Sequence, residues 1–326
     1  MRESSAPSAP PHTAVLLSAH GTVEREEDLP AFLANIRRGR PSPPQLIEEV
    51  TRRFRAIGGS PLLRISRAQA DALSARLGLP VQLGMRLWRP TIDEALEAMS
   101  AMGVTQLVSL PLAPQSVHVY HAAVAAAVEW RRAKGLASPT VVEVDPWGDE
   151  PALLEAFCDS IARGLTKFAP EDRDSVAIIL SAHSLPRAVI ARGDPYEQQF
   201  RAMADLVVAR RHDQGHHKYV VAFQSQGADG GDWLGPDLPT TFASLVAQGH
   251  TRALIASIGF LSDHVETLYD LDIEAKGLGQ AAGLAQVERA PSLDAHPLLI
   301  DAMATAVTRA LARANAEGCL VSRVRA

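Results

Sequence analysis

Short apolar runs alternate with helical patterns along almost the whole chain, and this alternation restricts the fold more than any other feature. Strands are predicted at 14–18, 80–85, 105–110, 140–144, 176–181, 219–223 and 253–259. Helical periodicity fills the intervals, at 44–56, 66–77, 91–102, 119–133, 151–167, 196–211 and 239–248, and a last helix fits 296–315. Strands that alternate with helices form parallel sheets covered by helices on both faces. The expected fold class is therefore α/β.

Two of the predicted strands end in nearly the same residues. "VLLSAHGT" occupies 15–22 and "IILSAHSLP" occupies 178–186, so half of the 326-residue chain separates His20 from His183. The repeat indicates two similar Rossmann-like, doubly wound halves, each with a histidine at the carboxyl end of a strand, where open α/β sheets bind ligands. We expect a disordered tail at 1–13, halves at 14–165 and 166–326, and a last helix that packs back on the first half.

The composition excludes several classes of function. A formal charge of −5 offers no general attraction to nucleic acid. No apolar run reaches the ~20 residues of a membrane helix, and no signal peptide is apparent, so a cytoplasmic protein without an integral membrane segment is expected. Cys158 and Cys319 are too few to ligate an iron–sulfur cluster. No phosphate-binding glycine motif supports a nucleotide cofactor.

Acidic residues recur in "GFLSDHVETLYDLDIEAKG" at 259–277. A helix is predicted to begin near Ser262 or Asp263, with Glu266 completing a capping box. Glu266, Asp270 and Glu274 then follow at i, i+4 and i+8, roughly along one helical face. A solvated acidic face is the ordinary explanation of such a row. Because the helix follows an apolar strand directly, a row of carboxylates that leads inward and serves a cation or a proton path is the alternative.

His183 is expected at the same edge of the sheet as this acidic helix. A histidine at a strand end is usually structural, but a neutral imidazole also ligates borderline metals and accepts protons near pH 7. An imidazole that faces a carboxylate indicates acid–base chemistry on a metal or on a weakly acidic N–H group. Two arginine clusters, in "NIRRGRPSPP" and "TRRFRAIGGSP", are suited to hold the carboxylates of an anionic substrate.

Taken in order, these segments resemble the ferrochelatases, which insert ferrous iron into a porphyrin. The resemblance runs from about residue 14 to 300 and rests on "RRGRPSPP", "RFRAIGGSPL", "SAHSLP" with "GDPY", "QS…WLGPDL" and "SDHVETLYDLDIE". It implies the chelatase fold, with two Rossmann-like domains facing each other across a porphyrin cleft. It also implies porphyrin and Fe²⁺ as substrates, no permanently bound cofactor, and transient contact with neighbouring enzymes of heme synthesis.

The resemblance also implies roles for individual residues. His183 matches the metal-site histidine of the family, and Glu266 matches the carboxylate opposite it. Asp270 and Glu274 match the carboxylates that lead away from the metal on a helix that the family winds wide. The residues expected to contact the porphyrin are His20, on the ring face opposite His183; Arg37, Arg53 and Ser60, at the propionates; and Tyr120, at the ring.

The choice of porphyrin stays open at this point. "IRRGR", "AIGGSPL" and "LAP" match the branch of the family that uses coproporphyrin III rather than protoporphyrin IX, but His20 stands where that branch has tyrosine. The alternative enzyme is a cobalt or nickel chelatase acting on sirohydrochlorin, which has a similar fold and histidine chemistry. The alternative outside catalysis is a heme-binding protein in which His20 ligates the iron.

Overall fold

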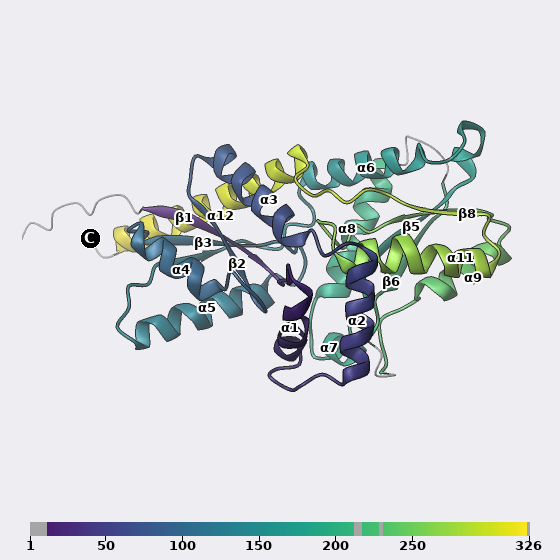
Figure 1. Cartoon of the computed structure of the whole chain (residues 1–326). Coiled ribbons are helices and arrows are strands. Elements are labelled where there is room, and N and C mark those ends of the chain that lie inside the picture. Colours follow the sequence, from purple (N-terminus) through teal and green to yellow (C-terminus); the bar gives the residue numbers. More distant parts are fainter. Residues whose placement is uncertain (1–11, 212–216, 228–230, 325–326) are drawn as a thin grey trace, which may run out of the picture.

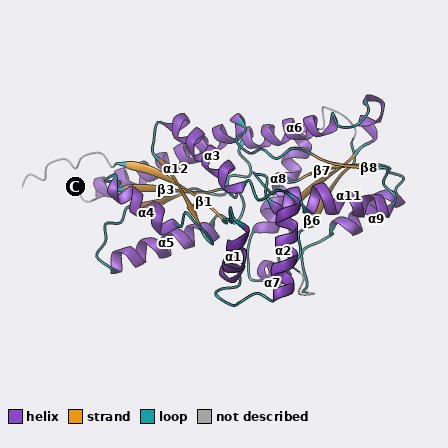
Figure 2. Cartoon of the chain, viewed as in Figure 1, coloured by secondary structure: helices purple, strands orange, loops and turns teal. Residues whose placement is uncertain are grey.

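Two separate four-stranded sheets organise the computed structural model, which describes residues 12–211, 217–227 and 231–324. Every pairing within each sheet is parallel, which confirms the predicted α/β class (Figures 1 and 2). The strands are β1 (Thr13–Ala19), β2 (Val81–Met85), β3 (Gln106–Pro111), β4 (Thr140–Glu143), β5 (Ala177–His183), β6 (Tyr219–Gln224), β7 (Arg252–Ala256) and β8 (Gln286–Arg289).

Both sheets have the same strand order. The first is β2-β1-β3-β4 and the second is β6-β5-β7-β8, so the two strands that end in Ser-Ala-His occupy equivalent central positions. Residues 1–11 of the predicted tail lie outside the described residues, and β1 begins at Thr13, one residue earlier than predicted. The reason is that Thr13 pairs with Gln106 and its hydroxyl donates to the Gln106 side chain at 2.9 Å.

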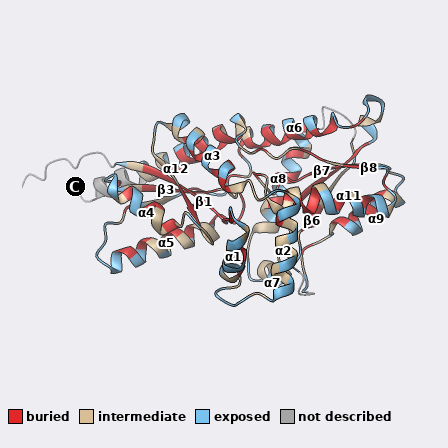
Figure 3. Cartoon of the chain, viewed as in Figure 1, coloured by how far each residue is buried: buried red, intermediate tan, exposed pale blue. Residues whose placement is uncertain are grey.

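Helices fill the intervals between the strands. They are α1 (Leu29–Ile36), α2 (Pro44–Ala56), α3 (Leu62–Leu77), α4 (Ile92–Ala101), α5 (His118–Ala133), α6 (Pro151–Leu165), α7 (Arg187–Ala191), α8 (Tyr196–Arg211), α9 (Leu238–Ala247), α10 (Val265–Leu268), α11 (Lys276–Ala282) and α12 (Pro297–Val324). Short 3₁₀ turns occupy η1 (Glu26–Asp28) and η2 (Pro170–Ser175), and a π-helix, η4, spans Asp270–Ala275. The outer faces of the α-helices are exposed, and the strands that they cover are buried (Figure 3).

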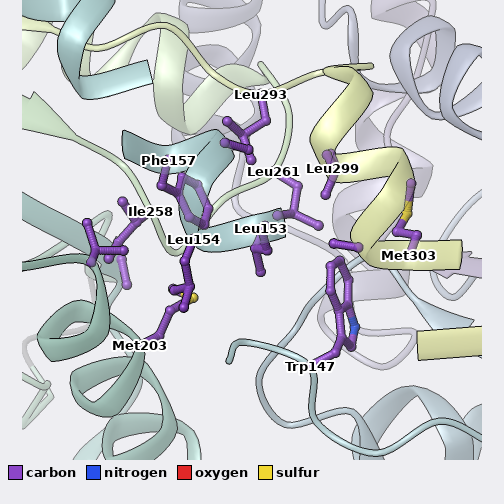
Figure 4. Close-up of a cluster of buried hydrophobic side chains, with 14 of the residues drawn as sticks. Trp147, Leu153, Leu154, Phe157, Met203, Ile258, Leu261, Leu293, Leu299 and Met303 are labelled. Carbon is purple, nitrogen blue, oxygen red and sulfur yellow. The ribbon is translucent and has the colours of Figure 1, made fainter. Parts of the chain in front are cut away.

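Two helices connect the halves. α6 follows the first sheet in sequence but packs against α8 and β7 of the second, whereas α12 follows the second sheet and packs against α3, α6 and β3. One continuous apolar core results, with Met303 near the buried Trp147 at one side and Phe157 and Met203 at the other (Figure 4). A separate small cluster is formed by the buried Val23, Leu29 of α1 and Phe54 of α2. The division of the chain at 165 and 166 stays a prediction.

A glycine brings β7 close to the strand that ends in His183. Gly259, in the turn after β7, donates its N–H to Ser181 O at 3.0 Å. A Cβ atom at Gly259 would lie 2.4 Å from Cβ of Ala182, which is far inside van der Waals contact. Any side chain at this position would therefore displace the end of β5, and only glycine allows the close approach.

Candidate active site

The carboxyl end of β5 is fixed by hydrogen bonds on several sides. Gln224, the neighbour of His183 on β6, accepts the Ser181 hydroxyl at 2.8 Å and donates to the backbone oxygen of Glu266 at 2.9 Å. The Tyr196 hydroxyl donates to the backbone oxygen of His183 at 3.0 Å. The imidazole therefore projects from a rigid strand end, and the backbone of the acidic segment is attached to the same scaffold.

His183 and Glu266 are in direct contact. Nδ1 of the imidazole lies 2.9 Å from Oε2 of the carboxylate, although the two residues come from distant segments. Their side chains are 33% and 35% exposed, so the pair stays open to a ligand. The side chain of His264 is nearby, with Nε2 at 3.9 Å from the same Oε2 atom.

The two partners shift each other's pKa in opposite directions. Burial alone would raise the pKa of Glu266, but the charge and hydrogen bond of His183, together with His264, lower it well below its usual value. Burial alone would lower the pKa of His183. The charge and hydrogen bond of Glu266 have the larger effect, so the pKa of His183 is raised. The pair therefore combines a persistent negative charge with an imidazole that binds protons more tightly than usual.

The helix that carries Glu266 begins differently from the prediction. α10 starts at Val265, and Thr267 rather than Glu266 closes the cap, because its hydroxyl accepts the His264 N–H at 3.0 Å. The predicted capping box with Glu266 is therefore wrong. Since Glu266 is one residue too early in the helix to reach back to the cap, its carboxylate is free to face His183.

The carboxylate row continues on the wide helical turn that the resemblance implies. In η4 the Glu274 N–H bonds Tyr269 O at 3.0 Å, the i→i+5 pattern of a π-helix, which is frequent at functional sites. The carboxylate of Asp270 accepts the Ser225 hydroxyl at 2.6 Å and Nη1 of Arg53 at 3.2 Å. Burial, with the charges of Glu266 and Glu274, raises the pKa of Asp270 despite these donors. Glu274 is exposed, so the row leads from Glu266 to solvent.

The residues predicted to hold propionates lie on α2, directly after α1 and just before α3. Arg53, on α2, also bonds Glu49 at 2.7 Å and lies 5.1 Å from the ring centre of Tyr269. Its charge is thus already engaged by two carboxylates. Arg37 follows α1, and within the described part of the chain its buried Nε atom has no hydrogen-bond partner. The Ser60 hydroxyl accepts the Leu62 N–H at 3.4 Å at the start of α3.

The first half contributes His20 to the same region. His20 follows β1 and reaches solvent, yet desolvation by its surroundings, with the positive charges of Arg86, His183 and His264, lowers the pKa of His20 to about 4. The guanidinium of Arg86 lies 5.1 Å from the ring centre of Tyr120. The structure therefore brings His20 and Tyr120 together through Arg86, on the same site as the pair from the second half.

Several of these residues were not predicted to be functional. Arg86 directly follows the carboxyl end of β2, so the rule that located His20 and His183 would also have found it. It lines a hollow of about 350 Å³ together with Asn35, Trp88 and Arg89. Tyr196 and His264 lie inside the motifs "GDPY" and "SDHVETLYDLDIE", but their contacts with His183 and Glu266 appear only in the structure. Among the described residues, no group of three or more His, Cys, Asp or Glu side chains forms a metal cage.

Comparison with known proteins identifies the family of the chain. The family model of ferrochelatase matches residues 12–311. The chain belongs to the ferrochelatase family. It is accordingly an enzyme that inserts iron into a porphyrin during heme synthesis. The recognition drawn from the sequence motifs is confirmed.

Ferrochelatases of other bacteria align with nearly the whole chain. A ferrochelatase of Acidobacterium capsulatum is 36% identical over 321 residues, covering 93% of this chain and 96% of the relative. A coproporphyrin III ferrochelatase of a Geobacillus species is 34% identical over 308 residues, covering 90% and 96%. These names support iron chelation over the alternatives of sirohydrochlorin metallation or heme binding without catalysis.

Solved structures share the fold at lower identity. SirB from Bacillus subtilis with Fe³⁺ superposes with a TM-score of 0.60 at 16% identity, covering 94% of this chain and 97% of SirB. The sirohydrochlorin chelatase SirB of Bacillus subtilis subspecies spizizenii with cobalt gives a TM-score of 0.55 at 13% identity, covering 91% and 94%. The two-domain chelatase fold predicted from the sequence is therefore confirmed. None of the helices in the described residues has the length and hydrophobicity required to span a bilayer.

Proposed function

We propose that this ferrochelatase inserts Fe²⁺ into coproporphyrin III, and that His183 and Glu266 form the pair that receives the iron and the pyrrole protons. The contact of 2.9 Å between Nδ1 and Oε2 carries the proposal. An imidazole and a carboxylate held at this distance, each about one third exposed, are suited to approach one face of a flat macrocycle.

The reaction requires two N–H protons to leave the porphyrin as Fe²⁺ enters, so that the ring nitrogens gain a metal and lose both hydrogens. Neutral His183 is the proton acceptor, and Glu266 stabilises the imidazolium that forms. Iron is consumed as a substrate, and we propose that no resident cofactor takes part.

Asp270 and Glu274 transfer protons away from the site or bind a second cation. A carboxyl group whose pKa is raised, as burial raises that of Asp270, exchanges protons closer to neutral pH than an exposed one does. Glu274 lies at the exposed end of the row. Protons therefore have a short sequence of acceptors between His183 and solvent.

Coproporphyrin III carries four propionates, whereas protoporphyrin IX carries two. Additional carboxylates can meet the guanidinium of Arg37, whose buried Nε is unpaired among the described residues, and those of Arg86 and Arg89, which line the hollow. At Arg89 they would compete with Glu94. A propionate at Arg53 has to compete with Glu49 and Asp270 for the guanidinium. The cytoplasmic location and the transient contacts with other enzymes of heme synthesis stay predictions.

Iron insertion measured without oxygen, with both porphyrins side by side, tests the proposal. We expect kcat/KM to be at least about tenfold higher with coproporphyrin III, since two more charge-assisted contacts form. Replacement His183→Ala is expected to lower kcat by a factor of about 10²–10⁴ while porphyrin binding persists. His250→Ala, at the amino edge of the second sheet, is the control. Rapid turnover by His183→Ala, or faster turnover of protoporphyrin IX, would contradict the proposal.

His20 is proposed to ligate the iron of the product. An imidazole whose pKa is lowered to about 4 is neutral at pH 7, and its free lone pair is available to a metal. We expect His20→Ala to change the visible absorption spectrum of the ferrous product complex, while the spectrum of the iron-free porphyrin complex stays the same. Identical product spectra for both proteins would exclude ligation by His20.

A further inference from the structure

A buried arginine lies behind the helix that carries the carboxylate row. Arg289, the last residue of β8, has a side chain that is only 8% exposed. Its Nε and Nη2 atoms donate to the two oxygens of Asp272 at 3.0 and 2.8 Å, and Nη1 donates to Oδ1 of Asp263 at 2.9 Å. One guanidinium thus binds two carboxylates. It forms a bidentate contact with Asp272 and a single hydrogen bond with Asp263.

The two carboxylates bound by Arg289 stand on either side of the proposed catalytic residues in the sequence. Asp263 precedes α10, and Asp272 lies inside η4, so Glu266 and Asp270 fall between them. Asp263 is also held by the Ser292 hydroxyl, which donates to it at 2.6 Å. The segment is therefore attached to β8 and the loop after it at two points.

The two faces of the π-helix are held by different partners. Asp272 binds Arg289 on the side of β8, while Asp270 binds Ser225 and Arg53 on the side of the site. π-helices are rare, and those that form are frequent at functional sites. Apolar residues in place of a buried ionic network often leave the free energy of unfolding unchanged or raise it. Stability alone is therefore a weak explanation for the Arg289 network.

We propose that Arg289 is a positioning residue of this ferrochelatase: by binding Asp263 and Asp272 together, it sets Glu266 against His183 and keeps the carboxylate row in line. The inference rests on the roles proposed above for Glu266 and Asp270. Arg289 itself lies behind the helix and acts through these residues. A displacement of about 1 Å in a catalytic group is enough to cost about 10²-fold in rate.

The test compares Arg289→Lys with Arg252→Lys in the full-length enzyme. Lysine keeps the charge at 289 but cannot bind two carboxylates as a fork. Arg252, the first residue of β7, pairs with Asp172 at 2.9 Å and is the matched control. Arg289 lies beside Ile255, near the other end of that strand. Rates are expressed per porphyrin-binding site, titrated without iron, so that partial unfolding does not lower them.

For Arg289→Lys we expect kcat to fall by about 10–100-fold and KM for iron to rise, while KM and Kd for the porphyrin stay within about twofold. Asp272→Asn keeps the arginine, removes one of its charged partners, and should show the same pattern at about 3–10-fold. Arg252→Lys should resemble the wild type.

Two results would overturn the inference. One is a kcat per site within about twofold of the wild type in both Arg289→Lys and Asp272→Asn. The other is an equal loss of porphyrin binding and turnover, which would mean a general structural role. If Arg289→Lys fails to fold, Asp272→Asn decides between these results. Failure of the wild type to insert iron would instead refute the proposed function.

Discussion

His183 and Glu266 show why single residues in this enzyme have to be interpreted as pairs. Each side chain alone would have its charged form disfavoured by burial, and the contact between them reverses the direction of both pKa shifts. The sequence motifs located both residues, but the spacing of residues along the chain could not predict that their side chains lie in direct contact. Arg86 follows the end of β2 and His264 lies within a quoted motif, but only the structure shows that they lie near His20 and Glu266.

The raised pKa of His183 has a measurable consequence for the pH dependence of the enzyme. Because the imidazole has to be neutral to accept a proton, kcat/KM should fall as pH decreases through a midpoint above the usual histidine value. Glu266→Gln removes the charge that raises this pKa, and burial then lowers it. We expect the midpoint to move to lower pH and the maximal rate to drop by about 10²-fold. The measurement is the pH profile of kcat/KM.

A suitable comparison for that profile is Glu171→Gln. Glu171 lies in η2, an exposed turn at the amino end of β5, so its replacement should leave the midpoint unchanged. A midpoint that stays in place or rises in Glu266→Gln would mean that Glu266 does not set the pKa of His183.

At the scale of elements, the site depends on strand ends and on one irregular helix. β5 presents His183, and η4 spaces the carboxylates with one residue more per turn than an α-helix. β8 is not among the strands predicted from the sequence, because its four residues, "QVER", are short and half charged. Yet this strand supplies Arg289, which binds the helix from behind.

Gly259→Ala tests the close contact between β7 and β5. The added methyl group overlaps Ala182, so either the turn or the end of β5 has to move. We expect the free energy of unfolding to fall by about 1–3 kcal/mol and kcat to fall with it. Urea unfolding and turnover measure the two effects.

Gly277→Ala provides the control, because a Cβ atom there meets nothing within 4 Å and alanine favours the α-helix. It should leave turnover unchanged and keep or improve stability. Equal stability and activity for Gly259→Ala would show that the strand end tolerates the displacement.

At the scale of the whole molecule, the prediction of two similar halves described the sheets well and their helices less well. Alternating patterns determine parallel strands locally, and the repeated Ser-Ala-His indicated the equivalent places of β1 and β5. The packing of α6 on the second half is not encoded in any period, since an apolar helical face does not specify which sheet it covers. The same holds for the contact of Arg53 with Asp270, whereas Glu49 lies four residues before Arg53 on the same helix and its ion pair follows from that spacing.

α12 is attached to the connection between the halves by ion pairs. Arg309 contacts Glu150 at 2.6 Å, and the Glu150 side chain is only 3% exposed. Arg309→Met would leave this carboxylate buried without its partner. We expect the free energy of unfolding to fall by about 2 kcal/mol at neutral pH.

The sign of the pH effect follows from burial, which raises the pKa of Glu150, whereas Arg309 lowers it. Without Arg309 the folded-state pKa rises further above the unfolded value, so the cost is largest at neutral pH and shrinks as the carboxyl becomes protonated. Thermal unfolding across pH measures it. A cost that grows on acidification would contradict this account, and Arg163→Met, on an exposed pair with Asp159, is the control.

The separate cluster that includes residues of α1 and α2 bears on how a large flat ligand gains access. Spreading the two halves apart would break the continuous core that α6 and α12 share, which approaches global unfolding in cost. Lifting α1 and α2 disturbs the small group around Val23, Leu29 and Phe54 and breaks the contact of Arg53 with Asp270. Moving α1 and α2 is thus expected to cost less free energy than separating the two halves. Arg53 lies on α2 and would move with these helices.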